Sequence, residues 1–298
     1  MLNVVSLFDG LGGARIALNN LRIPCNYWAS EIDPHAIKVH KAHFPQTAHI
    51  GDVKSLKGAM FMAQPIDLLI GGSPCQDLSR GGNMVGLTGA RSALFFEYVR
   101  LLKEIKPKYF ILENVKSMKK GTLEEINKYM GCTPIIINSS EFTAQNRTRC
   151  YWTNIPTEVL FPPGPDIRVK DIWDYNTPWE SHAAYTQVNK RARNTHGMER
   201  TGYIQCSFHA GPPLPRELVF SIEGKARAVS TTYSQFPFYS ENLFSGNVRR
   251  TTPLECERLQ GLPDDYTLVP GISKGQRYKM IGNGFTVPVI EYILKGMK

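Results

Sequence analysis

Several common features are absent from this 298-residue sequence. Its six cysteines, at positions 25, 75, 132, 150, 206 and 256, include no Cys-x-x-Cys pair, which argues against a zinc site. No apolar run is long enough to cross a membrane, and no signal peptide precedes the strand pattern at residues 2–7. We therefore expect an unexported, cytoplasmic protein whose thiols are free, so that one of them can act as a nucleophile.

The sequence also lacks a basic tail, internal repeats and low-complexity segments. Its 35 Lys and Arg residues exceed its 26 Asp and Glu residues by a formal charge of +9, and the excess is spread along the chain. A basic surface suits a polyanionic partner, although many soluble enzymes are mildly basic. Any such surface must therefore be assembled by the fold, for which a hydrophobic content of 42% supplies a full core.

Strand and helix patterns alternate through residues 1–160, which we expect to form the first domain. Strands are predicted at residues 3–7, 27–30, 66–70, 109–112 and 134–137, and helices at residues 14–21, 34–43, 93–103 and 122–129. This alternation predicts an α/β fold with a mostly parallel, doubly wound sheet.

The pattern changes after this domain. Residues 161–248 are rich in Pro, aromatic and small polar residues, which indicates a smaller, irregular module that has few strands or only small ones. Residues 249–298 return to the first domain, with a helix at 252–259, capped by Thr252 with Pro253 in its first turn, and a last helix at 288–297.

A glycine-rich turn follows the first strand, at residues 8–13. Such a turn lets the backbone approach a ligand and directs helix N–H groups at it, and Glu31 at the end of the next strand could bond ribose hydroxyls. Asp52 could bind an adenine amino group. A plain tight turn, or a site for NAD, would carry the same pattern.

Cys75 follows the predicted strand at 66–70, directly before a loop at residues 77–91 that contains four glycines. A thiol at a strand end beside a flexible loop is placed as a nucleophile would be, under a lid or binding loop. An isolated cysteine is more often a buried structural residue.

Further polar motifs follow later strands. Glu113 ends a strand, where partial desolvation can keep a carboxyl group protonated for general acid work. Arg147 and Arg149 lie two residues apart on an extended segment, so they are predicted to point to one side. Gly282-Asn283-Gly284 is typical of a turn, or returns the chain to a cofactor pocket.

Together these motifs, in this order, resemble the DNA (cytosine-5) methyltransferase family over nearly the whole chain except residues 160–248. The motifs that carry the resemblance are residues 8–13, Glu31-Ile32-Asp33, Asp52, Pro74-Cys75-Gln76, Glu113-Asn114-Val115, Gln145-Asn146-Arg147-Thr148-Arg149, Arg258-Leu259-Gln260-Gly261-Leu262-Pro263 and Gly282-Asn283-Gly284. The style is bacterial or phage, whereas Asp77-Leu78-Ser79 and residues 94–97 resemble the de novo methyltransferases of animals.

The resemblance implies a Rossmann-like class I S-adenosylmethionine-dependent methyltransferase fold, with residues 161–248 as a target-recognition domain. It implies S-adenosylmethionine as cofactor, S-adenosylhomocysteine as product, no metal, and methylation of C5 of a cytosine flipped out of duplex DNA through a covalent bond from Cys75 to C6. The catalytic residues implied are Cys75, Glu113, Arg147 and Arg149. The cofactor-binding residues implied are Phe8, Asp9, Gly10, Leu11, Gly12, Gly13, Glu31, Ile32, Asp52, Val53, Pro74, Leu94, Asn283 and Phe285.

DNA contacts are expected on the loop and on the irregular module, where Arg and Asn side chains can recognise base edges. The residues are Gln76, Ser79, Arg80, Arg91, Lys190, Arg191 and Arg193. The alternatives are the same chemistry on tRNA, whose enzymes carry a Cys-Phe-Thr tripeptide that this sequence lacks, a non-catalytic DNA-binding subunit, and an NAD-dependent oxidoreductase. A restriction-modification role and a monomeric or homo-oligomeric state stay open.

Overall fold

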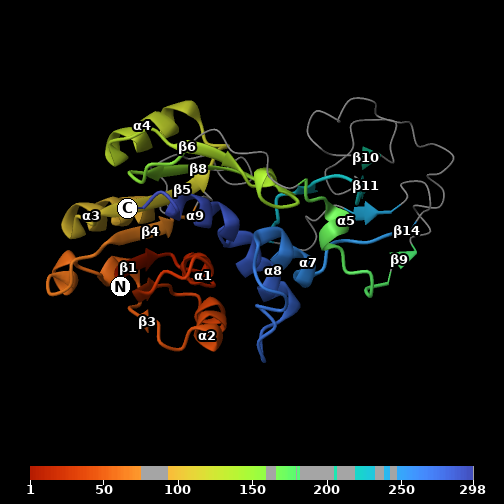
Figure 1. Cartoon of the computed structure of the whole chain (residues 1–298), viewed down its shortest axis with the longest axis horizontal. Coiled ribbons are helices and arrows are strands. Elements are labelled where there is room, and N and C mark those ends of the chain that lie inside the picture. The colour runs from red at the N-terminus through yellow and green to blue at the C-terminus, as the bar shows by residue number, and fades with distance from the viewer. Residues whose placement is uncertain are drawn as a thin grey trace. The chain divides into compact units, whose positions relative to one another are not determined.

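Seven strands form the main sheet, in the order β3-β2-β1-β4-β5-β8-β6 (Figure 1). The structure is a computed structural model that describes residues 1–74, 93–158, 166–178, 180–181, 205–206, 219–231, 238–241 and 247–297. The strands of the sheet are β1 (Leu2–Leu7), β2 (Cys25–Ser30), β3 (Ala48–His49), β4 (Leu68–Gly72), β5 (Tyr109–Val115), β6 (Ile135–Asn138) and β8 (Thr148–Thr153). Strands β1 to β5 pair in parallel, whereas β8 runs antiparallel to both β5 and β6. The predicted α/β fold with a mostly parallel sheet is confirmed.

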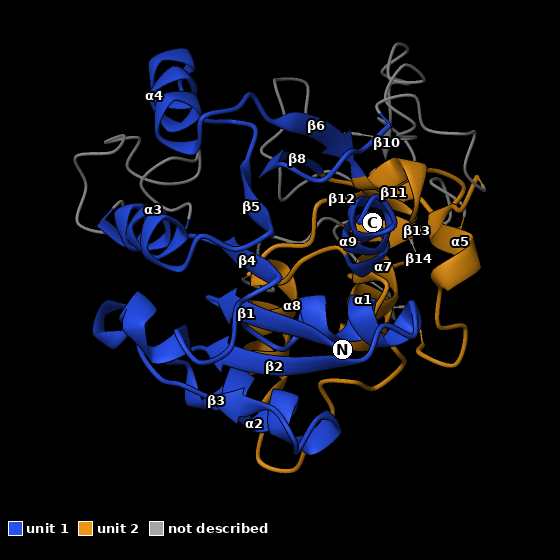
Figure 2. Ribbon diagram, turned by 60° about the vertical axis from the view of Figure 1, so that its left-hand side comes forward, with its two compact units in different colours: residues 1–138, 148–161, 287–298 blue, residues 139–147, 162–286 orange. Residues whose placement is uncertain are grey.

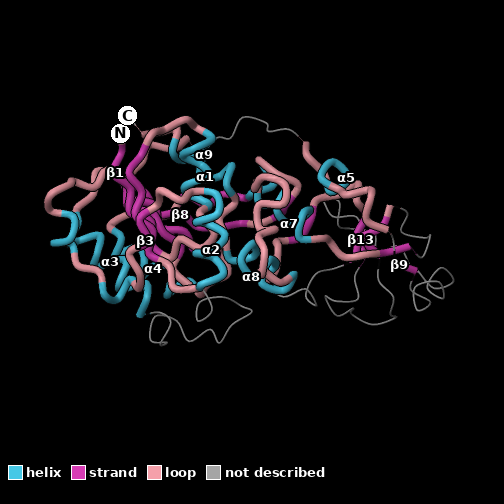
Figure 3. Tube along the Cα trace, turned by 90° about the horizontal axis from the view of Figure 1, so that it is seen from below, coloured by secondary structure: helices cyan, strands magenta, loops and turns pink. Residues whose placement is uncertain are grey.

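Helices cover both faces of this sheet, and two short 3₁₀ helices follow β3. They are α1 (Gly13–Asn20), α2 (Pro34–His43), α3 (Ala93–Ile105), α4 (Lys120–Met130), α9 (Val287–Leu294), η1 (Val53–Ser55) and η2 (Gly58–Phe61). Figures 2 and 3 show α1 and α9 against one face and α3 and α4 against the other. Residues 4–7 of β1 are all buried, because a central strand covered on both faces has no solvent side. Helix α3 buries Phe95, Tyr98, Val99 and Leu101, the three- and four-residue spacing of one helical face.

The chain divides into two compact units, coloured separately in Figure 2. The first unit holds the main sheet and comprises Met1–Asn138, Thr148–Phe161 and Val287–Lys298, and the second comprises Ser139–Arg147 and Pro162–Thr286. Residues 249–286, expected to return to the first domain, thus cluster with the second unit. The functional division of the chain into residues 1–160, 161–248 and 249–298 stays a prediction.

Short elements make up the described part of the second unit. They are η4 (Ser139–Glu141), β7 (Gln145–Asn146), α5 (Val169–Ile172), β9 (Glu180–Ser181), β10 (Gln205–Cys206), β11 (Val219–Ser221), β12 (Ala226–Arg227), β13 (Phe238–Ser240), β14 (Asn247–Val248), α7 (Pro253–Gln260) and α8 (Lys274–Asn283). The small strands pair as β10-β11-β13, β12-β7 and β14-β9. The described strands of this unit are two or three residues long.

The two longer helices of this unit differ in how well the sequence signals them. At α7, Thr252 Oγ1 accepts from the Glu255 N–H at 3.2 Å and Glu255 Oε2 accepts from the Thr252 N–H at 2.7 Å, which is a capping box and confirms the predicted helix. Helix α8 has no counterpart among the predicted helices. Its buried face carries Arg277, paired with Glu257 at 3.0 Å, and a charged residue at a core position breaks the apolar periodicity.

Candidate active site

The predicted cofactor and acid motifs meet at one edge of the main sheet. Strands β1, β2, β4 and β5 are parallel, and the register sets Leu7 beside Ser30 and Gly71, and Gly72 beside Glu113. The segments that follow these strands therefore emerge together at what we call the carboxyl edge. Ligands of open α/β sheets bind outside such an edge.

The glycine-rich turn at residues 8–13 has an unusual backbone. Phe8, Gly10 and Gly12 have φ angles of 55°, 61° and 89°, in the left-handed region that is strained for a residue such as Phe. Gly12 also precedes α1, and a Cβ atom there would lie 2.7 Å from Nδ1 of His40. Glycine at position 12 is thus required both by its backbone angle and by the close approach of a side chain.

Glu31 closes this turn from the neighbouring strand. Its Oε2 accepts a hydrogen bond from the Gly10 N–H at 2.8 Å, and its Oε1 accepts from the N–H groups of Ile32 and Asp33 at 2.8 and 2.9 Å. A carboxylate has about four acceptor positions, so among the described residues one position remains on Oε2. Glu31 can therefore fix the turn and accept a hydroxyl group from a ligand at the same time.

Asp9 points away from the carboxyl edge. Its Oδ1 accepts from the Tyr27 hydroxyl at 2.7 Å, and its Oδ2 lies 2.6 Å from Nδ1 of His40. The side chains of Asp9 and His40 are both fully buried. A cofactor contact from Asp9 would therefore come from its backbone.

The segment after β3 supplies a second carboxylate. Asp52 Oδ1 caps η1 by accepting from the Lys54 N–H at 3.0 Å, which leaves Oδ2 as an acceptor within the described residues. Ser30 Oγ donates to the Gly51 carbonyl at 2.8 Å and joins this segment to the end of β2. Val53 is buried, whereas Ile32 exposes 69% of its surface, an apolar side chain available to a planar ligand.

Glu113 and Arg149 form an ion pair across β5 and β8. Arg149 Nε lies 3.0 Å from Glu113 Oε1, and the two side chains are only 16% and 13% exposed. Strand β8 is the antiparallel neighbour of β5, and its Arg149 lies opposite Val115, two residues after Glu113. Next to Glu113, the Asn114 side chain donates to the backbone and hydroxyl oxygens of Ser73 at 3.2 and 3.1 Å, which fixes the chain just before Pro74.

Arg147 has different partners from Arg149. Its guanidinium donates to the carbonyl oxygens of Gly282 and Gly284 at 3.2 Å, within the second unit. Arg147 is 4% exposed. Its hydrogen bonds join the motif at residues 145–149 to the motif at residues 282–284. Asn283, the last residue of α8, is exposed, and Phe285 is buried. Leu94, on α3 of the first unit, packs partly buried against the core.

Burial raises the pKa of the cysteines at positions 25, 132, 150 and 256. For Cys150 the pKa rises to about 11, first through burial and second through the negative charge of Glu113. A thiol with a raised pKa forms little thiolate at neutral pH, so these four sites are poor nucleophiles.

Some of the predicted site residues lie outside the described residues. These are Cys75, Gln76, Ser79, Arg80, Arg91, Lys190, Arg191 and Arg193. Pro74 is the last described residue before that gap, two positions beyond Gly72 at the end of β4.

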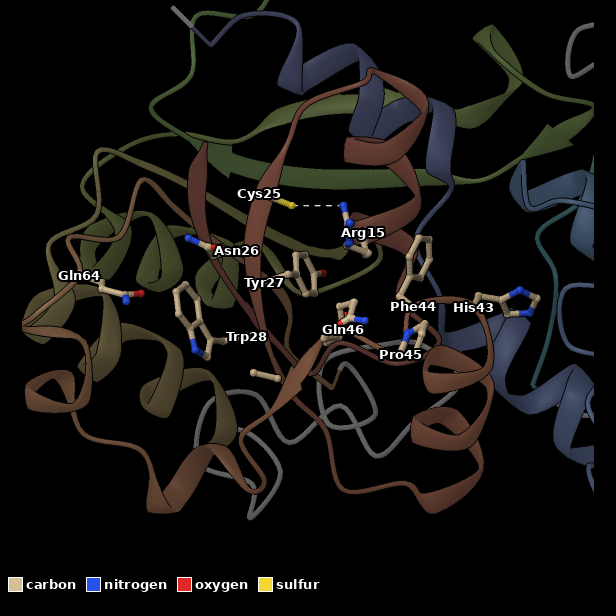
Figure 4. Close-up of a pocket in the computed structure, with 12 residues that line it drawn as sticks. Arg15, Cys25, Asn26, Tyr27, Trp28, His43, Phe44, Pro45, Gln46 and Gln64 are labelled. Atoms are coloured by element: carbon tan, nitrogen blue, oxygen red, sulfur yellow. Dashed lines mark hydrogen bonds between the residues drawn. The ribbon is translucent and has the colours of Figure 1, made fainter.

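A cavity of about 560 Å³ lies elsewhere in the first unit, along β2 and the segment between α2 and β3 (Figure 4). Arg15 lies at its wall, donating to Cys25 Sγ at 3.2 Å and stacking over the ring of Phe44 at 5.0 Å. None of its lining residues belongs to the predicted motifs, and the strand-end geometry locates the candidate site better than this cavity does. Its lining residues are Arg15, Cys25, Asn26, Tyr27, Trp28, His43, Phe44, Pro45, Gln46, Thr47, Ala48 and Gln64.

Within the described ranges, no group of three or more His, Cys, Asp or Glu side chains is arranged to hold a metal ion. The same residues include no helix long and apolar enough to cross a membrane.

The chain is similar to known proteins in both sequence and structure. The family model for C-5 cytosine-specific DNA methylases matches residues 2–298. Type II methyltransferase M1.ScrFI of Lactococcus lactis subsp. cremoris is 30% identical over 323 residues, which cover 99% of this chain and 77% of that protein. Type II methyltransferase M.HpaII of Haemophilus parainfluenzae is 29% identical over 316 residues, covering 96% and 86%.

Two solved structures share the fold at low sequence identity. The Entamoeba histolytica methyltransferase EhMeth matches with a TM-score of 0.75 at 17% identity, covering 99% of this chain and 97% of that chain. The S. pombe Dnmt2 methyltransferase matches with a TM-score of 0.70 at 21% identity, covering 99% and 97%.

The parallel sheet, with its glycine turn and strand-end carboxylates at one edge, is the architecture of a class I S-adenosylmethionine-dependent methyltransferase. The family match extends over nearly every residue. The chain therefore belongs to the C-5 cytosine-specific DNA methylase family and is a DNA (cytosine-5) methyltransferase. Membership of that family implies S-adenosylmethionine as methyl donor.

Proposed function

We propose that this enzyme methylates a cytosine flipped out of duplex DNA, with Cys75 as the nucleophile and S-adenosylhomocysteine as the second product. The observation that carries the proposal is the Glu113–Arg149 ion pair at the carboxyl edge. Glu113 pairs in register with Gly72, which lies three residues before Cys75 in the chain. The carboxyl group and the cation therefore lie on strands beside the end of β4, and Cys75 follows β4 in the sequence.

The chemistry answers a specific difficulty, because cytosine C5 is a poor nucleophile. Attack of the Cys75 thiolate on C6 forms a C–S bond and moves an electron pair toward C5 and N3. Glu113 bonds N3 and the exocyclic amine, so it stabilises the charge that develops there, and Arg149 holds O2 and orients Glu113. S-adenosylmethionine supplies an electrophilic methyl group on a sulfonium. C5 takes that methyl group, a base removes the C5 proton, and Cys75 leaves C6 by elimination.

The cofactor residues fit an adenosyl group in their donor and acceptor chemistry. The free acceptor position of Glu31 suits a ribose hydroxyl, and Oδ2 of Asp52 suits the adenine amino group. The exposed side chain of Ile32 suits an adenine face. Main-chain contacts are proposed for residues 8–13, and further contacts for Val53, Pro74, Leu94, Asn283 and Phe285.

The DNA side of the proposal rests on sequence. Residues 77–91 close over the flipped base, with Gln76, Ser79, Arg80 and Arg91 near the DNA. Residues 161–248 recognise a short target, with Lys190, Arg191 and Arg193 as a contact patch. The curated relatives are named Type II methyltransferases, which supports a role in restriction-modification.

The test is transfer of labelled methyl groups from S-adenosylmethionine to unmethylated duplex DNAs of varied sequence, with tRNA as a parallel substrate. We expect 5-methylcytosine in digested DNA, no transfer by Cys75→Ala, and near-normal transfer by Cys132→Ala, whose thiol has a raised pKa. Transfer to tRNA alone would identify RNA as the substrate. A Cys75→Ala variant that stays active would contradict the proposed nucleophile.

A further inference from the structure

A buried chain of hydrogen bonds lies beneath the glycine-rich turn, within the first unit. It runs from the Tyr27 hydroxyl to Asp9 Oδ1 at 2.7 Å, from Asp9 Oδ2 to His40 Nδ1 at 2.6 Å, and from His40 Nε2 to Thr47 Oγ1 at 2.9 Å. Tyr27, on β2, is 5% exposed, and His40, on α2, is fully buried. Two elements distant in sequence from the turn thus both hold the same carboxylate.

Asp9 is the residue through which these elements act on the turn. It lies between Phe8 and Gly10, whose φ angles of 55° and 61° are both left-handed. Such a conformation in a bulky residue is strained and persists only where its surroundings enforce it. The Asp9 N–H donates to the Ser30 carbonyl at 3.0 Å, so its backbone and side chain are both anchored.

The imidazole of His40 also fills the space under the turn. A Cβ atom on Gly12 would lie 2.7, 3.0 and 3.2 Å from three atoms of that ring. The ring therefore meets the turn in two places: it bonds the Asp9 carboxylate, and it fills the space that a side chain at position 12 would need. Neither contact is part of the methyl transfer chemistry, and His40 belongs to none of the motifs found in the sequence.

We propose that His40 is a positioning residue for cofactor binding, which holds Asp9 and thereby keeps residues 8–12 in the backbone conformation that receives the adenosyl ligand. The inference rests on the proposed cofactor role of this turn. Its two ring nitrogens have separate functions: Nδ1 positions the turn through Asp9, whereas Nε2 joins α2 to Thr47 and serves packing only.

Two substitutions separate these functions. In His40→Asn the side-chain amide can occupy the position of Nδ1 and bond Asp9, whereas in His40→Gln it reaches the position of Nε2 and bonds Thr47. Both variants lose the ring, so both should lose stability. Only His40→Gln loses the bond to Asp9, and only it should loosen the turn.

The experiment measures the dissociation constant of S-adenosylhomocysteine by titration calorimetry, together with the thermal unfolding temperature of the ligand-free proteins. We expect His40→Gln to bind about tenfold more weakly than wild type, as for loss of one charged hydrogen bond, and His40→Asn to stay within about twofold. The unfolding temperatures of the two variants should fall by similar amounts. Thr47→Val, which removes the bond to Nε2 alone, should bind the ligand as wild type does.

Equal ligand affinities for His40→Gln and His40→Asn would overturn the inference, because His40 would then act by packing alone. Should His40→Gln not fold, Tyr27→Phe replaces it, since that variant removes the other bond to Asp9 and keeps His40. It is expected to bind several-fold more weakly, and unchanged binding would overturn the inference as well. No binding by the wild-type protein would instead contradict the proposed cofactor site.

Discussion

The side-chain amide of Gln145 donates to the side-chain oxygen of Gln260 at 3.1 Å and to the carbonyl of Leu259 at 3.0 Å. Gln260 donates in turn to the Ile281 carbonyl at 2.8 Å and accepts from the Thr286 hydroxyl at 2.8 Å. Both glutamine side chains are fully buried. The side-chain amides of Gln145 and Gln260, which are more than a hundred residues apart in sequence, therefore bond to each other, and Gln260 also bonds to the end of α8.

Replacing Gln260 by Leu should lower the free energy of unfolding by about 2–4 kcal/mol, because it leaves buried donors and acceptors unsatisfied. Urea unfolding followed by circular dichroism measures the change. Gln64→Leu, at an exposed position, is the matched control and should change stability by less than about 0.5 kcal/mol. A similar decrease in the free energy of unfolding for both variants would mean that the buried hydrogen bonds of Gln260 do not stabilise the protein.

Replacing Glu113 by Gln should reduce kcat by about 10²–10³-fold while the binding of S-adenosylhomocysteine stays unchanged. The amide keeps the size of the side chain but cannot exchange a proton with the base as a carboxyl group can. Single-turnover methyl transfer measures the chemical step directly. Glu97→Gln, a carboxylate of α3 paired with Arg100, is the control and should leave kcat near wild type. If Glu113→Gln retains full kcat, the carboxyl group does not stabilise the reacting base.

Alkylation by iodoacetamide should distinguish Cys75 from the two buried cysteines, Cys150 and Cys256. A pKa of about 11 leaves Cys150 with far less thiolate at pH 7 than an ordinary thiol, and its reactivity should rise only as the pH approaches 11. We expect one fast site at pH 7 that disappears in Cys75→Ala and persists in Cys206→Ala. Fast labelling of Cys150 at pH 7, found by mass spectrometry, would contradict the effect of burial on its pKa.

His49 should make the protein less stable in mild acid. Burial, and then the neighbouring His40, lower the pKa of His49 below its usual 6.5, and its ring nitrogens have no hydrogen-bond partner among the described residues. As the pH falls through 6.5 the unfolded chain binds a proton that the folded chain does not, so the free energy of unfolding decreases until the pH passes the folded pKa. His49→Phe, which keeps the edge-to-face contact with His40, should flatten this decrease.

Urea midpoints at pH 7, 6 and 5 measure that effect. His43→Phe replaces an exposed histidine of the same region and should keep the wild-type slope. An unchanged slope in His49→Phe would assign the acid sensitivity to other groups.

Two glycines of α8 should respond in opposite directions to alanine. A Cβ atom on Gly282 would lie 2.5 Å from the Ser230 carbonyl oxygen, whereas one on Gly275 meets no atom within 4 Å. Gly282→Ala should lower the free energy of unfolding by about 1–3 kcal/mol through overpacking. Gly275→Ala should raise it by about 0.5–1 kcal/mol, because alanine is the better helix former. Thermal and urea unfolding test both, and a stabilised Gly282→Ala would exclude the proposed clash.

The carboxyl edge could be predicted from sequence because its residues follow apolar strands directly. Glu31 and Glu113 each come at the end of a short apolar run, and parallel strands set such ends side by side. The order of the motifs carried the family resemblance, which the family match confirms.

The inward direction of Asp9 could not be predicted, because its partners come from β2 and α2 and meet only in the folded chain. The same reason applies to Arg147 and Arg149. Two-residue spacing predicted one side for both, yet Arg147 bonds the carbonyls of Gly282 and Gly284 whereas Arg149 pairs with Glu113 on β5. Helix α8 could not be predicted from apolar periodicity, because an arginine such as Arg277 is expected at the surface and here is buried.

The chain passes between its two units four times, after Asn138, Arg147, Phe161 and Thr286. The second unit is therefore not a contiguous cassette, since residues 139–147 lie apart from the rest of it in sequence. If relatives exchange target specificity by a single crossover in the gene between the codons of these two residues, Gln145 and Gln260 come from different parents. Each buried amide would then pack against residues of the other parent. Recombinants that keep both segments from one parent are the ones expected to fold.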